Sequence, residues 1–194
     1  MGVRWVNEPE NLMPSIPREP PQLPSPERVQ ELLFDASRLG RDDMIPVLLE
    51  AGADIEAVDA KGHTALVLAT YHGFEAAAAL LLNAGANPNG TTASGSPLMG
   101  VAFKGHIAIA RQLLTAGADP NLRNAAGQTA VMMSALFDRR DIIDLLLSAG
   151  ADIDAVDAAG NDAAAVARMQ GNGELAQWLQ SPRELASTVN AQTT

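Results

Sequence analysis

The sequence predicts an all-α solenoid of five stacked units, each made of two helices joined by a tight turn. Three observations predict it. A short Ala-Gly-Ala motif recurs along the chain, with its glycines at positions 52, 85, 117 and 150, which are 33, 32 and 33 residues apart. A second glycine series keeps the same period, and a leucine-rich run lies between the two glycines of a unit. A fixed period of this length indicates small repeated units that bury their apolar faces only against their neighbours.

Each unit is expected to contain a first helix, a tight turn at the earlier glycine, a second helix, and a left-handed terminus at the later glycine. Glycine accepts positive φ at these points without a Cβ penalty. Asp138 stands where the fourth unit should have its turn glycine, and aspartate is among the few other residues that tolerate this conformation. The first helices open with side chains that can cap free amides, namely Thr64, Ser96, Thr129 and Asp162.

These residues resemble the ankyrin repeat. The Gly-x-Thr-Pro-Leu-His signature of that family corresponds to four segments, and its Gly-Ala-Asp-x-Asn ending corresponds to Gly117–Asn121. The four segments are Gly62–Val67, Gly95–Met99, Gly127–Met132 and Gly160–Ala165. The resemblance covers roughly residues 27–180 and implies an ankyrin-repeat α-solenoid with short β-turn loops. The loose, alanine-rich repeats are similar to those of small bacterial members.

The sequence departs from the family pattern at two kinds of position. The signature histidine is replaced by smaller or apolar residues, where we expect apolar packing in place of hydrogen bonds between units: Val67, Met99, Met132 and Ala165. One residue is missing from the loop around residues 89–94, so that loop tip should be shorter.

Three regions follow from composition and period. Residues 1–26 hold seven of the twelve prolines, which favours an extended N-terminal arm, either a solvated tail or a segment that docks through Trp5 and its apolar neighbours. Residues 27–180 form the repeat domain, with units at about 27–58, 59–91, 92–123, 124–156 and 157–180. In the last unit Gln180 replaces a leucine, as expected of a terminal cap with one wet side, and Trp178 should face the core. Residues 181–194 are expected to be a flexible tail.

The candidate binding residues are the two that precede the first-helix glycine in every unit. In this fold class such pairs line the concave side together with the loop tips. Tyr71, Phe103 and Phe137 belong to three successive pairs, in a chain that has only seven aromatic residues. An exposed row of aromatic and aliphatic groups usually marks a contact site, although these rings could instead pack on their own loops or under the arm. The full set is Arg38 with Leu39, Tyr71 with His72, Phe103 with Lys104, Leu136 with Phe137, and Met169 with Gln170.

Three cations lie near this set in the sequence pattern or on the loop tips. Lys61, Arg123 and Lys104 are expected to orient a partner, while the remaining loop tips are small. Phe34 should be buried in the first helix, and Phe74 should open a second helix.

The net charge of −10 limits the partners that this chain can attract. Such a field repels nucleic acid and anionic membranes and favours a protein with a basic surface. No cysteine is present, so a disulfide framework is excluded, and we expect a cytoplasmic protein.

No catalytic, metal or cofactor motif emerges from the sequence. The three histidines are scattered, and no glycine-rich loop follows a strand to hold phosphate. The resemblance implies a non-catalytic module that binds one specific client protein and regulates, stabilises or inhibits it. The alternatives are an immunity or antitoxin-like inhibitor of an effector enzyme, a structural subunit of a homo-oligomer, and an enzyme or small-ligand sensor.

Overall fold

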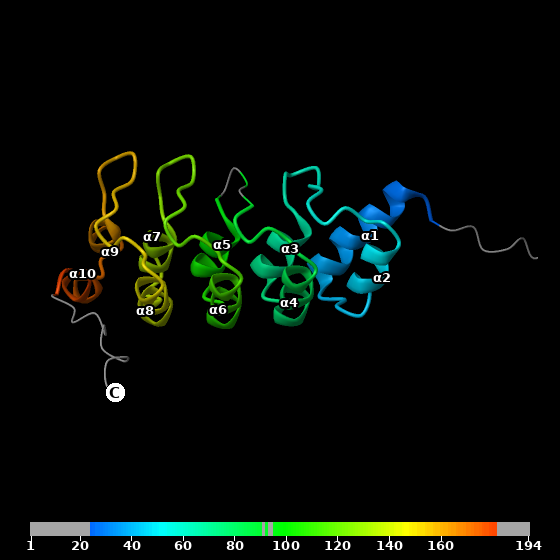
Figure 1. The fold of residues 1–194 in the computed structure, drawn as a ribbon. Coiled ribbons are helices and arrows are strands. Elements are labelled where there is room, and N and C mark those ends of the chain that lie inside the picture. The colour runs from blue at the N-terminus through cyan, green and yellow to red at the C-terminus, as the bar shows by residue number, and fades with distance from the viewer. Residues whose placement is uncertain (1–23, 91, 93–94, 182–194) are drawn as a thin grey trace, which may run out of the picture.

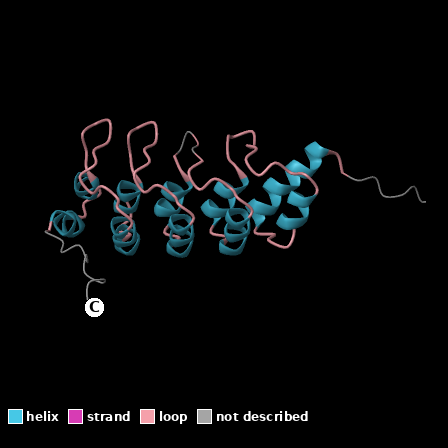
Figure 2. Ribbon diagram, in the orientation of Figure 1, coloured by secondary structure: helices cyan, strands magenta, loops and turns pink. Residues whose placement is uncertain are grey.

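The computed structural model describes residues 24–90, 92 and 95–181, and in this part of the chain ten helices follow one another as five pairs. The pairs lie side by side in an elongated row (Figure 1), and the loops between them project from one side (Figure 2). This arrangement confirms the predicted helical solenoid. The helices are α1 (Pro26–Leu39), α2 (Ile45–Glu50), α3 (Ala65–His72), α4 (Glu75–Asn83), α5 (Pro97–Lys104), α6 (Ile107–Thr115), α7 (Ala130–Ala135), α8 (Arg140–Ser148), α9 (Ala163–Met169) and α10 (Gly173–Gln180).

The first helix of each pair begins at a capping side chain. Thr64, Ser96, Thr129 and Asp162 each accept a hydrogen bond from the backbone N–H three residues later, as the sequence predicts. Helix α1 starts in the same way at Ser25, with Pro26 in its first turn, where the missing N–H costs nothing. The helix therefore begins at the last residue of the expected arm. Residues 1–23 of the arm and the expected tail beyond Ser181 lie outside the described residues.

The core runs the length of the row as a single cluster, to which both helices of every pair contribute. Met99 and Met132, which occupy positions of the family histidine, are buried in it, whereas Val67 and Ala165 are only half-buried. At the C-terminal end Trp178 packs against the core and Gln180 is exposed, which agrees with a terminal cap.

The expectation that Phe34 is buried is wrong, because its side chain is half-exposed. Val67, which occupies the same position in the second unit, is also only half-buried although α3 packs against both α1 and α5. This position therefore lies at the edge of the core in both units.

Consecutive pairs contact each other at the turn that joins the two helices of a pair. The residue that opens each second helix packs against the turn of the preceding pair. A methyl group on Gly40 would lie 2.4 Å from Cδ1 of Phe74, and one on Gly73 would lie 2.7 Å from Cε1 of His106. Glycine is therefore required at this turn for two reasons: it adopts the positive φ, and it leaves room for the close approach of the neighbouring side chain.

The corresponding turns of the third and fourth pairs are contacted by residues of other types. A methyl group on Gly105 would lie 2.9 Å from Cζ of Arg139. In the fourth pair Asp138 replaces the glycine with a φ of 53°, and its carboxylate is hydrogen-bonded to the side chain of Asn172. A polar contact thus takes the place of the close packing at this turn.

Hydrogen bonds between neighbouring loops also fix the position of each unit relative to the next. The side-chain amide of Asn89 donates to the carbonyl oxygen of Gly117 at 3.0 Å, and its oxygen accepts from the N–H of Asp119 at 2.7 Å. Asn121 makes the corresponding two bonds one unit later. These bonds fix the spacing of the projecting loops, because each one joins side chain to backbone across neighbouring units.

The backbone hydrogen bonds that close the projecting loops confirm that the loop around residues 89–94 is shorter. In the first projecting loop the hairpin closes between the N–H of Asp59 and the carbonyl of His63, four residues apart. In the shortened loop it closes between Thr92 and Gly95, three residues apart, with both N···O distances at 3.0 Å.

The contact at the turn predicts that alanine lowers the free energy of unfolding by different amounts at two glycines with similar φ. These are Gly40, with a φ of 69°, and Gly171, with a φ of 77°. Both variants carry a left-handed strain of about 1–2 kcal/mol. Gly40→Ala also forces its methyl group into the Phe74 ring, whereas no neighbouring atom lies within 4 Å at Gly171. We expect Gly40→Ala to lower the free energy of unfolding by a further ~1–3 kcal/mol, measured by urea denaturation. Equal losses in the two variants would contradict the packing contact.

Candidate partner-binding surface

Five large apolar side chains, one from each helix pair, are exposed at or just after the C-terminal ends of the first helices. They are Leu39, Tyr71, Phe103, Phe137 and Met169, and we call this set the exposed ladder. Their exposed fractions range from 37% for Phe103 to 68% for Leu39. Among the described residues only three other large apolar side chains are as exposed, namely Val47, Val58 and Val156.

The rings of the exposed ladder contact their neighbours across unit boundaries. Phe103 and Phe137 meet edge to face, with their centroids 4.9 Å apart. The Nζ atom of Lys104 lies over the ring of Tyr71, 4.4 Å from its centroid. These contacts order the rings and leave them open, since all three remain more than a third exposed. The described loops therefore do not cover them.

The other members of the predicted pairs have different environments. Leu136 is half-buried and packs against the core, while Gln170 is exposed. The guanidinium of Arg38 is paired with Asp35 at 3.0 Å and with Asp59 of the next unit at 3.2 Å.

His72 lies beside the exposed ladder and is itself exposed. Its ring stacks on Phe74 with the centroids 6.3 Å apart. Burial, followed by the positive charges of Arg38 and Lys104, lowers the pKa of His72 below its ordinary value. This imidazole is therefore neutral at neutral pH.

An open groove of about 610 Å³ lies between the first projecting loops and the ends of α3 and α5. Tyr71 and Phe103 of the exposed ladder form part of its wall. Its other apolar lining comes from Val67, Leu68, Pro97, Met99 and Met133. Polar groups border it at Arg38, Asp59, Lys61, His63 and His72. We call this feature the loop–helix groove.

Asp59 holds the loop that carries Lys61 and His63. Its Oδ1 atom accepts from the N–H groups of Lys61 at 2.9 Å and of His63 at 3.0 Å. Burial alone would raise the pKa of Asp59, but these backbone bonds and the nearby His63 outweigh it, so the pKa lies below its ordinary value. The carboxylate is thus ionised at neutral pH.

The three cations expected to orient a partner are placed differently. Lys61 borders the loop–helix groove, and Lys104 stands beside it over the ring of Tyr71. Arg123 is not among the groove's lining residues. Its guanidinium donates to the carbonyl oxygens of Gly127 and Val156, so it joins two neighbouring loops.

The groove itself is what sequence reasoning missed. Met99, at the family histidine position, and Met133 both line the groove, as do Thr92 and Gly95 of the shortened second projecting loop.

Two further features bear on the chemistry of this surface. Within the described residues, no group of three or more histidine, cysteine or acidic side chains is arranged to hold a metal ion. The search of the same residues for a helix long and apolar enough to cross a membrane finds none.

Compared with known families, residues 33–123 and 98–192 match a family model described as ankyrin repeats (3 copies). Comparison with curated proteins finds no match.

The electrostatics of Asp59 predict how acid affects stability. Because its pKa is lower in the folded state, the carboxylate stabilises the fold above its unfolded pKa of about 3.9, and this contribution is lost as pH falls through the folded pKa. Asp59→Asn should fold, since Asn124 accepts the equivalent N–H bonds in the third projecting loop. Between about pH 5 and about pH 3, the free energy of unfolding should fall less in Asp59→Asn than in the wild type. Identical pH dependences in urea denaturation would refute this role for the charge.

Proposed function

The chain belongs to the ankyrin-repeat family, whose repeats are generally non-catalytic protein–protein interaction modules, and from this premise we propose that it binds a partner protein through the exposed ladder. The observation that carries this proposal is that every helix pair exposes a large apolar side chain at one of the two positions before its turn residue: Leu39, Tyr71, Phe103, Phe137 and Met169. A row of this kind exposes apolar area to water on every unit, and binding a partner removes that cost.

The aromatic members are suited to anchoring an interface. Tyr71, Phe103 and Phe137 carry large rigid side chains that lose little conformational entropy on binding. The contact of Phe103 with Phe137 and that of Lys104 with Tyr71 already restrict these side chains before a partner arrives. Preorganised groups of this kind contribute more of their gross interaction energy to affinity.

We further propose one specific client rather than many, in the cytoplasm. The net charge of −10 favours a client with a basic surface and disfavours nucleic acid and anionic membranes. Occupying the exposed ladder regulates, stabilises or inhibits that client. A client that loses its activity on binding would identify an inhibitor of the immunity or antitoxin type, and one that stays active would identify an adaptor or stabiliser.

Charge reversal of the aromatic members should abolish binding. We expect Tyr71→Asp/Phe103→Asp/Phe137→Asp to lose the client that the wild-type chain retains in co-purification from its source cells. Each substitution places a carboxylate where an apolar anchor should be desolvated. The variant should keep its helical circular dichroism, because all three side chains are exposed.

The matched control is Val47→Asp/Ala76→Asp/Ala116→Asp, which makes the same change in charge at exposed positions outside the exposed ladder. This control should retain the client. If the ladder variant stays folded and retains the same client, the exposed ladder is not the binding surface. The purified wild-type chain and both variants should also be compared by sedimentation. If the wild type and the control are tight dimers and the ladder variant is a monomer, the surface instead joins two copies of this chain.

A further inference from the structure

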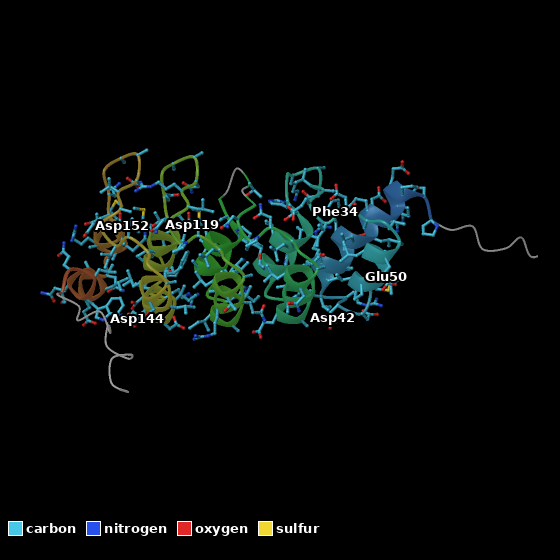
Figure 3. The ribbon with its side chains drawn as sticks, viewed as in Figure 1. Phe34, Asp42, Glu50, Asp119, Asp144 and Asp152 are labelled. Atoms are coloured by element: carbon cyan, nitrogen blue, oxygen red, sulfur yellow. The ribbon has the colours of Figure 1, made fainter. Side chains whose placement is uncertain are left out.

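Exposed carboxylates lie on both sides of the row. One set is on the second helices and the turns that precede them, at Asp42, Asp43, Glu50, Glu75, Asp141, Asp144 and Glu174, and another is on the loops, at Asp54, Glu56, Asp119, Asp152 and Asp154. Asp42 and Asp144 lie on the second-helix side, whereas Asp119 and Asp152 lie toward the projecting loops (Figure 3). The lining of the loop–helix groove departs from this acidic surface.

The loop–helix groove has the opposite character. Both lysines of the chain stand at it, Lys61 on the loop wall and Lys104 beside Tyr71 on the helix wall. His63 and His72, two of the three histidines, also line it. Its one lining carboxylate, Asp59, is already engaged by Arg38 at 3.2 Å and by two backbone N–H groups.

The cations at the groove differ in whether a carboxylate neutralises them. Arg38 is balanced by Asp35 and Asp59, both within 3.2 Å. Among the described residues, no carboxylate lies within ion-pairing distance of Lys61 or Lys104. An unpaired ammonium group in the groove lining, Lys61, and a second beside it over the ring of Tyr71, Lys104, favour a negatively charged occupant.

Most of the groove lining is apolar. Val67, Met99 and Met133 contribute to it together with the rings of Tyr71 and Phe103. Methionine adapts its shape to an incoming side chain, and an aromatic ring supplies a rigid wall. The groove can therefore bury an apolar side chain while the lysines reach the residues on either side of it.

We propose that the loop–helix groove binds a segment of the partner protein in which an aliphatic or aromatic side chain is flanked by aspartate or glutamate. This inference rests on the proposed function and adds the chemistry of the segment that enters the surface. The apolar groove and its small number of cations fit a short acidic segment, whereas a nucleic acid would need a longer basic track and would meet the repulsion of the acidic helices.

The test uses the full-length chain and a displayed library of random peptides. Selection on the wild type should enrich peptides with Asp or Glu beside a large apolar residue. A synthetic enriched peptide, labelled with fluorescein, should then bind Lys61→Glu/Lys104→Glu at least about tenfold more weakly than the wild type in an anisotropy titration. Added salt should weaken binding to the wild type.

The matched control is Arg28→Glu/Arg111→Glu, which changes the net charge by the same amount at exposed residues outside the groove. Its affinity for the peptide should lie within about twofold of that of the wild type, because salt screens the electrostatic interaction of charges that lie far from the groove. Equal losses in the two double variants would overturn the proposal, as would enrichment of basic or uncharged peptides, failure to enrich any peptide, or preferential binding of a labelled oligonucleotide. If the enriched peptides are basic or uncharged and the Tyr71/Phe103/Phe137 variant fails to bind them, the proposed function still holds. Only the proposal of an acidic segment is then rejected.

Discussion

The structure depends on one contact, in which the residue that opens each second helix packs against the turn of the preceding pair. Phe74 lies against Gly40 and His106 against Gly73, at distances that leave no room for a Cβ atom. Because the contact recurs once per unit, it sets how far each helix pair stands from the next and how it is rotated. A linear stack of this kind has few long-range contacts to correct an error, so each nearest-neighbour interface must define its own geometry.

This register has a direct consequence for the surface. A left-handed turn follows the first helix of each unit, and the two residues before this turn lie at the edge of the core. Apolar side chains at one of these two positions, such as Tyr71 and Phe103, become a continuous row only because successive turns are aligned. The hydrogen bonds of Asn89 and Asn121 hold the loops at a matching spacing, so the groove between loop and helix has two fixed walls.

Features that repeat with the period could be predicted from the sequence. The caps, the left-handed turns with Asp138 among them, and the shortened second projecting loop are local properties of a few adjacent residues. Features that depend on a neighbouring unit could not. The pairing of Arg38 with Asp59 joins residues 21 positions apart, whose side-chain conformations the sequence does not specify.

Hydroxyl-radical footprinting of the free, full-length chain tests the central claim most directly, because it reports whether each aromatic ring meets water. The account predicts that Phe103, Phe137 and Tyr71 are oxidised readily, whereas Phe74, which packs against the core, is protected. Protection of all three rings to the level of Phe74 would show that the chain already covers this surface by itself, and would contradict a site open to a partner.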